Sequence, residues 1–421
     1  MRRFFYVALP AFLTDGGFYL ALFTLSHALE VAGASNARIA LCFGVYNLAY
    51  MFAAPLLGRL SDRHRGASVL TGGLIFALVY TVLGGLMNLE TGPAGVTVSL
   101  RGGGELALAC YGAMAAMALA NALFWPAFQA RIADREPTPE ALEAAIRSFN
   151  IAWTAGKSAG FLVGGLLFLR APQACLWLVA AAGWTVVACA LLDRAPRGEG
   201  ATSEPTQSDV PKGRKGAFLL AALLANFALW GAVSTLKGLA PTLAHGWSLS
   251  PQQTGILLAA MLAAQGVGFM ALQSGRWTYR PKLLAAALPV ACLGLASLVW
   301  ARGLGLALPA ALMIGWAQAV TYAASVYYSL DFDERRGLRT GIHEAVLAGG
   351  GCLPILGGVI ADQTGDELAS LWLMLGIGVA LALVVGGLLW RAGPDERSEG
   401  ELSPGEASSE DPPYQPPSAG L

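Results

Sequence analysis

The sequence predicts an all-α membrane protein whose twelve transmembrane helices form two pseudo-symmetric six-helix bundles. Of its 421 residues, 55% are hydrophobic and only 13% are charged, which is too apolar for a soluble protein. Apolar stretches of about 20 residues, the length that crosses a bilayer as a helix, recur along the chain. One short motif occurs once in each half, as Gly58-Arg59-Leu60-Ser61-Asp62-Arg63 and as Gly275-Arg276-Trp277-Thr278-Tyr279-Arg280. Such internal duplication is typical of transporters built from two similar bundles.

Each apolar stretch is expected to be a helix, because lipid offers its backbone groups no other hydrogen-bond partners. The first stretch follows Met1-Arg2-Arg3 directly and continues to about Leu29, so we interpret it as a membrane helix rather than a secretory signal peptide. The twelve predicted spans cover residues 4–28, 38–58, 68–88, 105–130, 145–169, 174–192, 216–239, 253–274, 283–301, 304–328, 341–362 and 368–390.

Composition between the spans predicts the domain boundaries. Residues 1–192 form the N-terminal bundle and residues 216–390 form the C-terminal bundle. Residues 193–215 are rich in Gly, Pro, Ser and charge, which predicts a flexible linker. Residues 391–421 are polar, acidic and rich in Pro and Ser, so we expect a disordered tail.

Basic residues predict the orientation of the chain. Cytoplasmic loops of membrane proteins carry an excess of Lys and Arg. If the N-terminus is cytoplasmic, most of the 27 Lys and Arg residues fall on that side, and both termini and the linker are cytoplasmic. The few basic residues predicted to lie outside are Arg38, Arg101, Arg170, Lys237 and Arg302.

Paired glycines repeat in corresponding helices of the two halves. Gly164-Gly165 lies in the fifth predicted span and Gly357-Gly358 in the eleventh. Small residues let helix backbones approach closely in membranes, so these pairs predict close helix packing.

Several function classes lack a signature in the sequence. The six cysteines lie in apolar stretches and form no CxxC pair or metal-type cluster with His, so neither a metal nor another cofactor is predicted. The net charge is zero, which gives no nucleic-acid-binding signature. Gly156-Lys157-Ser158 resembles a phosphate loop only superficially, because it lies inside an apolar helix. No nucleophile arrangement is visible, so we do not expect an enzyme.

Two charges fall in the middle of predicted spans. Asp15 lies in the first span and Lys157 in the fifth. Because an unpaired charge in the membrane is costly, we expect them to form an ion pair within the N-terminal half. The pair has either a structural role or a role in binding a proton or an anionic substrate.

The motif at residues 58–63 resembles the G-x-L-x-D-R signature of the major facilitator superfamily, which it matches at Gly58, Leu60, Asp62 and Arg63. The second copy keeps Gly275 and Arg280 but has Tyr279 where an acid would stand. The resemblance extends over nearly the whole chain and implies the twelve-helix fold. It also implies that the two motif copies form a gating loop, in which Asp62 meets the cytoplasmic start of the eleventh helix. The alternative is that Asp62 only anchors a loop.

In this superfamily, helices 1, 4, 7 and 10 line the central cavity, and here their polar residues follow helical spacing. The alternative is that these side chains only join helices through hydrogen bonds. His343 and Glu344, at the predicted start of the eleventh helix, are candidates for ion coupling or for a simple helix-start acid. Asp331 and the charges after it are expected to form a solvated loop, with the loops around Arg63 and Arg280 as its candidate partners. The predicted cavity residues are Asp15, Tyr19, Asn121, Trp125, Gln129, Asn226, Trp230, Gln318 and Tyr322.

The resemblance implies a secondary active transporter that moves a small solute by alternating access, coupled to protons if Asp15 titrates. Alternatives are an exporter of amphipathic drugs or metabolites and a non-transporting sensor. Phe161 in place of a helix-5 proline, and the absence of an arginine within helix 4, weaken the drug-exporter interpretation. The expected partners are the solute, protons and the lipid bilayer. The expected location is a bacterial inner membrane, with the protein as a monomer.

Overall fold

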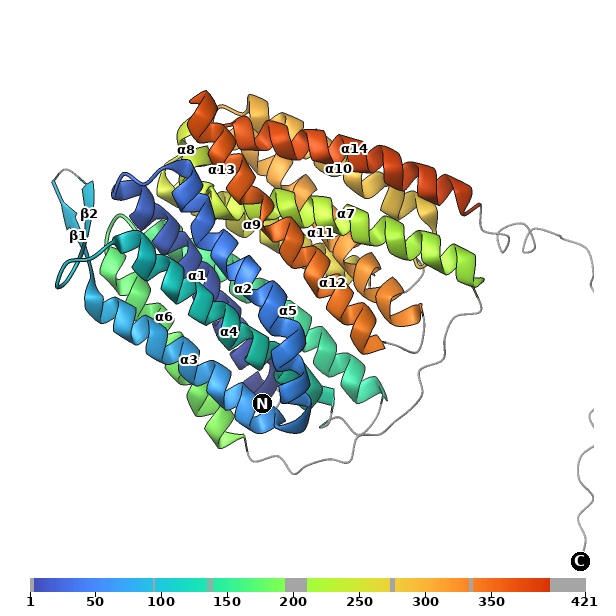
Figure 1. The fold of residues 1–421 in the computed structure, drawn as a ribbon, viewed down its shortest axis with the longest axis horizontal. Coiled ribbons are helices and arrows are strands. Elements are labelled where there is room, and N and C mark those ends of the chain that lie inside the picture. Colours follow the sequence, from blue (N-terminus) through green and yellow to red (C-terminus); the bar gives the residue numbers. More distant parts are fainter. Residues whose placement is uncertain are drawn as a thin grey trace, which may run out of the picture.

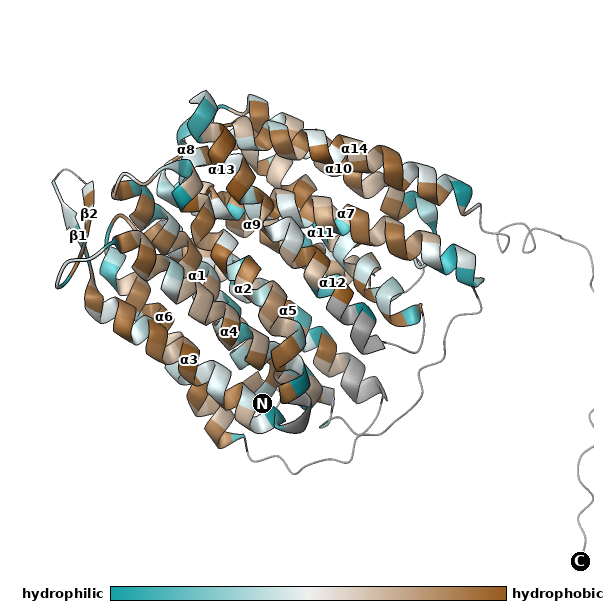
Figure 2. Cartoon of the chain, viewed as in Figure 1, coloured by the Kyte–Doolittle hydropathy of each residue, from teal (hydrophilic) through white to brown (hydrophobic). Residues whose placement is uncertain are grey.

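The computed structural model describes residues 4–93, 95–133, 135, 139–193, 210–272, 277–332 and 336–393. The predicted tail, apart from its first residues, and most of the predicted linker lie outside these residues. The chain forms a bundle of long helices, coloured from blue to red in Figure 1. Apolar residues cover the lengths of the helices, and the polar residues gather at their ends (Figure 2).

The N-terminal half contains six long helices, a short π-helical turn and a β-hairpin. Its elements are η1 (Phe4–Ala8), α1 (Leu9–Val31), α2 (Asn36–Arg63), α3 (Arg65–Leu86), β1 (Met87–Gly92), β2 (Gly95–Leu100), α4 (Leu106–Ala133), α5 (Pro139–Leu167) and α6 (Pro172–Leu192).

The C-terminal half repeats this order of long helices, with two differences. A short helix follows its first long helix, and its fifth long helix is divided in two. Its elements are α7 (Lys212–Gly238), α8 (Ala240–Trp247), α9 (Pro251–Ala271), α10 (Pro281–Trp300), α11 (Leu304–Asp331), α12 (Arg336–Gly351), α13 (Leu353–Thr364) and α14 (Ala369–Arg391).

Eleven helices of the described residues are long and apolar enough to cross a membrane. They match eleven of the predicted spans, with α12 and α13 together forming the predicted span 341–362. The remaining predicted span corresponds to α5, which is long enough but carries Arg147 and Lys157 among its apolar residues. α5 packs between α1 and α9, so it belongs to the bundle like the other eleven. The twelve-helix prediction is therefore confirmed.

The all-α prediction missed the β-hairpin between α3 and α4. β1 and β2 pair antiparallel, from Met87 opposite Leu100 to Gly92 opposite Gly95. The β2 sequence alternates Val96 and Val98 with polar residues, the pattern of a half-buried strand. We call the end of the bundle that carries this hairpin the hairpin end, and the opposite end, where α6 ends and α7 begins, the linker end (Figure 1).

The division between α12 and α13 follows from Pro354, which has no backbone N–H to donate and interrupts the hydrogen-bond ladder. The carbonyl oxygen of Gly351, just before the division, accepts a hydrogen bond of 3.0 Å from Asn47 Nδ2 on α2. A side chain of one half therefore satisfies a backbone group that the helix break exposes in the other half.

The paired glycines allow close helix packing, as predicted. In each pair, the first glycine contacts a helix of its own half and the second contacts a helix of the opposite half. A Cβ on Gly164 would lie 2.8 Å from the Phe23 ring on α1, within the N-terminal half, whereas one on Gly165 would lie 2.9 Å from the Gly255 Cα on α9, in the other half. A Cβ on Gly357 would meet α14 within its own half. One on Gly358 would lie 2.6 Å from the carbonyl oxygen of Asn36 on α2, across the halves.

Polar contacts also join the two halves at the hairpin end. The Asp362 carboxylate, at the end of α13, accepts hydrogen bonds from the backbone N–H groups of Asn36 (2.8 Å) and Ala37 (2.9 Å) at the start of α2. Thr242 donates to the Asn36 side chain at 2.8 Å, and His245 pairs with Glu30. In Figure 1 the helices of the two halves run together at this end and fan out toward the linker end. The structure is therefore closed at the hairpin end.

Replacing Asp362 with alanine should loosen this closure. A carboxylate at a helix N-terminus contributes about 0.3–1 kcal/mol at an exposed site, so the open fraction should rise roughly two- to fivefold. The measurement is the distance distribution between spin labels on the exposed residues Ala32 and Gln363, which flank the contact. The matched control is Glu367→Ala, an exposed acid in the turn that follows α13. Equal distributions for Asp362→Ala and Glu367→Ala would contradict the role of Asp362.

Candidate functional site

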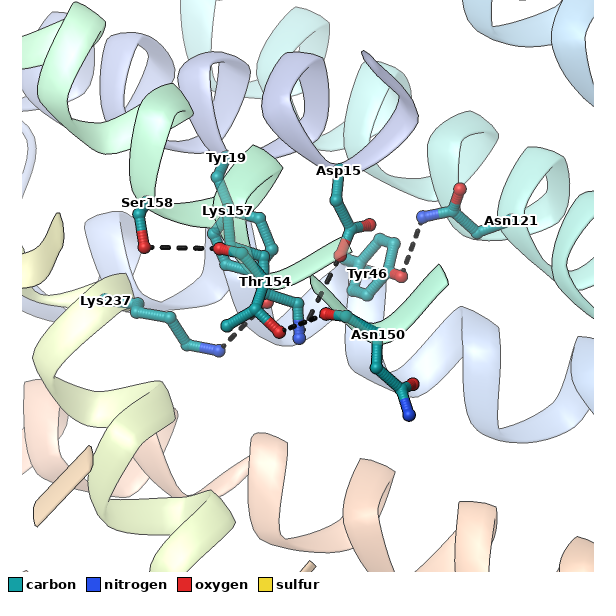
Figure 3. Close-up of polar contacts among 9 residues, drawn as sticks. All are labelled: Asp15, Tyr19, Tyr46, Asn121, Asn150, Thr154, Lys157, Ser158 and Lys237. Atoms are coloured by element: carbon teal, nitrogen blue, oxygen red, sulfur yellow. Dashed lines mark hydrogen bonds and ion pairs between the residues drawn. The ribbon is translucent and has the colours of Figure 1, made fainter. Parts of the chain in front are cut away.

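An ion pair lies inside the N-terminal half, where the sequence predicted it. Asp15 Oδ2 on α1 is 3.9 Å from Lys157 Nζ on α5, and their side chains are only 6% and 3% exposed (Figure 3). The Lys157 ammonium also lies 3.1 Å from the ring centroid of Trp153, one turn earlier on α5. Close approach of α1 and α5 makes the pair possible, because Gly156 and Gly160 have no side chains to separate the two backbones.

Lys237 is a second buried ammonium. The predicted span 216–239 includes it near its outer end, and the structure places it within α7 with 1% exposure. Its Nζ donates to the Tyr19 hydroxyl at 3.3 Å, which joins α7 to α1 across the halves (Figure 3). The rings of Tyr19, Phe43 and Trp230 each have their centroids 5.1 Å from this Nζ. Its helical spacing from Ser234 and Trp230 predicts this position on the polar face of the helix.

Tyr46 extends the same site from α2, and sequence reasoning did not select it. Asn121 Nδ2 on α4 donates to the Tyr46 hydroxyl at 2.9 Å (Figure 3). The Tyr46 ring packs against Phe18, with centroids 4.4 Å apart. Predicted residues Asp15, Tyr19 and Asn121 are thus gathered on neighbouring helices of the N-terminal half.

A hydrogen-bonded chain crosses the C-terminal half. Asn226 Nδ2 on α7 donates to Ser325 Oγ on α11 at 2.9 Å, and this oxygen lies 3.0 Å from His343 Nδ1 on α12. His343 is buried and its Nε2 has no hydrogen-bond partner among the described residues. The sequence placed His343 at the start of its helix, but α12 begins seven residues earlier, at Arg336, so His343 lies two turns inside. The adjacent Glu344 is half-buried and interacts electrostatically with Lys157.

Half-buried aromatic rings connect this chain to the lysines. Trp230 stacks on Tyr322, with centroids 6.1 Å apart, and Tyr322 lies 5.4 Å from the His343 ring. Trp153 of the N-terminal half contacts Tyr322 at 6.0 Å and Phe269 on α9 at 6.3 Å. These rings therefore surround the boundary between the two halves.

Three predicted cavity residues do not join these contacts. Trp125 packs on Phe149 of α5, in a separate apolar cluster. Gln129 is exposed and makes no hydrogen bond or ion pair with the described residues. Eight residues of helix turn about 80° beyond whole turns, so Gln129 points away from the face that carries Asn121. Gln318 is buried, and its Oε1 has no partner in the described part of the chain.

The predicted gating loop is largely helical in its first copy. α2 continues through Gly58 to Arg63, and only His64 separates it from α3. The side chains of Asp62 and Arg63, and all of Gly275, lie outside the described residues, so the predicted contact of Asp62 stays a prediction. In the second copy, Arg280 is exposed just before α10.

Asp331 is held at the linker end, which corrects its interpretation as part of a solvated loop. Lys215 Nζ lies 3.1 Å from Asp331 Oδ2, and the Tyr279 hydroxyl donates to the same oxygen at 2.5 Å. Tyr279 thus occupies the acid position of the motif and binds an acid from α11 instead. The contact ties α7 and α11 to the turn before α10.

Within the described residues, no group of three or more His, Cys, Asp or Glu side chains could hold a metal ion. The arrangement instead consists of two similar helical halves that meet around buried charges, amides and aromatic rings. One end of their interface is closed, and the helices separate toward the other. These features are typical of membrane transporters built from two similar bundles.

A model of the Major Facilitator Superfamily matches residues 7–237 and again residues 220–414. The chain belongs to this superfamily, which confirms the resemblance of its sequence. It is therefore a multi-pass membrane protein and a secondary transporter of a small solute. The two overlapping matches correspond to the two halves of the fold.

Solved structures share the fold. The nucleoside transporter NupG superposes with a TM-score of 0.69 at 14% identity, covering 92% of this chain and 99% of its own. Its aspartate-to-alanine mutant gives a TM-score of 0.70 at 14% identity, with coverages of 90% and 98%. A bacterial homologue of the human lysosomal transporter Spinster, in an inward-facing and occupied conformation, gives 0.65 at 15% identity, with coverages of 91% and 95%. No curated protein matches the sequence.

Proposed function

We propose that this protein couples solute movement to protons and that Asp15 carries the coupled proton. The observation that supports this is the ion pair of Asp15 with one buried lysine, close to a second buried lysine (Figure 3). Lys157 belongs to its own half and Lys237 to the opposite half, and Asp15 interacts electrostatically with both. A proton on this one carboxylate therefore weakens its attraction to an ammonium group on each side of the boundary.

Protonation of Asp15 acts on the equilibrium between the two conformations. The ionised carboxylate attracts both ammonium groups and favours the closed hairpin end, where Lys237 also holds Tyr19. The neutral acid loses this attraction, so proton binding favours separation of α1 from α7. A ligand shifts a conformational equilibrium only by binding the two states differently, and the ion pairs supply that difference. Other titratable groups around this region are Tyr19, Tyr46, Tyr50, Tyr322, His343 and Glu344.

We further propose that the linker end faces the cytoplasm of a bacterial inner membrane and that the protein functions as a monomer. The excess of Lys and Arg at the linker-side loops supports this orientation. The structure then corresponds to a conformation closed toward the outside. A protease-cleavable tag after Leu421 should be cut in inside-out vesicles and protected in right-side-out ones.

Asp15→Asn should uncouple solute movement from protons. The experiment measures proton flux and solute exchange in proteoliposomes for a panel of organic acids, sugars, amino acids, nucleosides and cationic drugs. Wild type should move protons with one solute class, whereas Asp15→Asn should still exchange that solute at equilibrium without moving protons. Asp366→Asn, a change of the same kind at the exposed hairpin end, is the control.

Undiminished proton movement in Asp15→Asn would contradict the role of Asp15. Proton-coupled movement of cationic drugs alone would favour the amphipathic exporter. A wild type that moves none of the solutes would favour the non-transporting sensor.

A further inference from the structure

Lys237 is a buried ammonium that makes no ion pair with a carboxylate of the described residues. Its one hydrogen bond there is to the neutral hydroxyl of Tyr19. A charge inside a membrane protein is costly and usually marks a partner, a ligand or an ion pathway. The three surrounding rings contribute cation–π attraction, which offsets only part of the cost of burial.

The charges near Lys237 balance only while both acids of the site are ionised. Asp15 is the carboxylate that interacts with both Lys157 and Lys237. The second acid of the site, Glu344, interacts with Lys157. Two ammonium groups thus face two carboxylates, and neither carboxylate forms an ion pair with Lys237. When Asp15 is protonated, one positive charge is in excess.

Two further donors without partners lie on the same face of α7. Ser234 precedes Lys237 by three residues and Trp230 precedes Ser234 by four, which is the spacing of one helix face. Ser234 Oγ and Trp230 Nε1 are inaccessible and have no hydrogen-bond partner in the described part of the chain. An ammonium, a hydroxyl and an indole N–H on one face form a set of donors suited to a carboxylate, which accepts several hydrogen bonds.

Aromatic rings continue from this face. Trp230 stacks on Tyr322, which in turn contacts Trp153 and Phe269. All four rings are half-buried at the boundary between the halves. An apolar or aromatic body attached to a carboxylate would lie against them.

We propose that the solute is an organic anion with an apolar or aromatic body, whose carboxylate binds Lys237 together with Ser234 and Trp230. In the present conformation the Lys237 ammonium donates its hydrogen bond to the Tyr19 hydroxyl. Because Tyr19 and Lys237 belong to opposite halves, opening of the hairpin end separates them and frees the ammonium for the solute. This inference names the substrate class for the proposed function and rests on it.

The test measures ligand binding to the purified full-length protein without a proton gradient. The probes are phenylacetate and indole-3-acetate, their neutral amides, and the amines phenethylamine and tryptamine. The readouts are the unfolding temperature and quenching of tryptophan fluorescence. We expect the two carboxylates to raise the unfolding temperature and quench fluorescence, with the matched amides and amines at least tenfold weaker.

Variants assign the effect to Lys237. Lys237→Gln should weaken carboxylate binding about 10- to 100-fold, because a hydrogen bond to a charged group contributes about 1.5–3 kcal/mol. Lys237→Arg should retain binding, and so should Lys282→Gln, an exposed lysine at the linker end. Ser234→Ala keeps both lysines and should weaken carboxylates by several-fold, which gives a second test if Lys237→Gln does not fold.

Three outcomes would overturn the proposal: equal binding of the amides or amines, unchanged carboxylate binding in Lys237→Gln, or no response of wild type to either carboxylate. Binding of carboxylates by both wild type and Asp15→Asn, together with proton movement that survives in Asp15→Asn, would remove the proposed coupling and leave the anion site intact.

Discussion

Lys157→Met should lower the free energy of unfolding by about 3–5 kcal/mol, because it leaves the Asp15 carboxylate buried without its ion-pair partner. The loss should exceed that of any exposed lysine by an order of magnitude. Lys157 also lies against the Trp153 ring, so its removal takes away a cation–π contact as well. The measurement is denaturant unfolding of the purified protein in detergent, followed by tryptophan fluorescence.

A double-mutant cycle separates the ion pair from other effects of the substitution. Asp15→Asn together with Lys157→Met removes both charges and should recover most of the lost stability, because replacing a buried pair with uncharged groups is often neutral. Lys282→Met, at an exposed position, controls for the loss of a lysine as such. If the double variant is as unstable as Lys157→Met alone, the two side chains do not act as a pair.

Gly165→Leu should open the hairpin end, whereas Gly164→Leu should not. A side chain at Gly165 would collide with the backbone of Gly255 and Pro251 in the opposite half, which cannot rotate away as a side chain could. Overpacking costs about 1–3 kcal/mol, and here separation of the halves relieves it, so the open fraction should rise about 5- to 150-fold. Spin labels on Ala32 and Gln363 report the opening.

The neighbouring glycine is the matched control. A side chain at Gly164 would meet the Phe23 ring inside the N-terminal half, so Gly164→Leu should lower stability without separating the halves. The same contrast should hold for Gly358→Leu and Gly357→Leu. Gly112→Leu, where a Cβ would meet nothing within 4 Å, should neither lower stability nor separate the halves. Identical label distances in all these variants would show that the glycine contacts do not control closure.

The lengths of the apolar stretches and the glycine pairs in corresponding helices were sufficient to predict most of the fold. The twelve spans follow from hydropathy because the bilayer requires about 20 apolar residues for each crossing. The β-hairpin was missed because its two strands occupy a short connection whose apolar residues are few. The Asp15–Lys157 pair could be predicted because each charge stands alone in an apolar stretch, and each has one plausible partner in its half.

The remainder of the site depends on where helices begin and end, which hydropathy does not settle. Lys237 stands near the end of its apolar stretch, and its contacts with Tyr19 and Phe43 of the opposite half accompany its burial. His343 is buried because α12 starts two turns before it, in a polar segment that does not resemble a span. Gln129 lies off the site because two successive steps of four residues turn it about 80° away from the face of Asn121.

The glycine contacts between α5 and α9 and between α2 and α13 constrain how this transporter can move. Both lie near the hairpin end, on two pairs of helices that correspond by pseudo-symmetry, so that while they hold they can serve as pivots for movement of the linker end. The segment of α5 from the glycines to the linker end is about 25 residues, or roughly 38 Å, long. A rotation of only about 10° at the glycines would therefore move the linker end by roughly 7 Å. Access at the linker end can thus change widely while these contacts hold, whereas opening of the hairpin end requires them to separate.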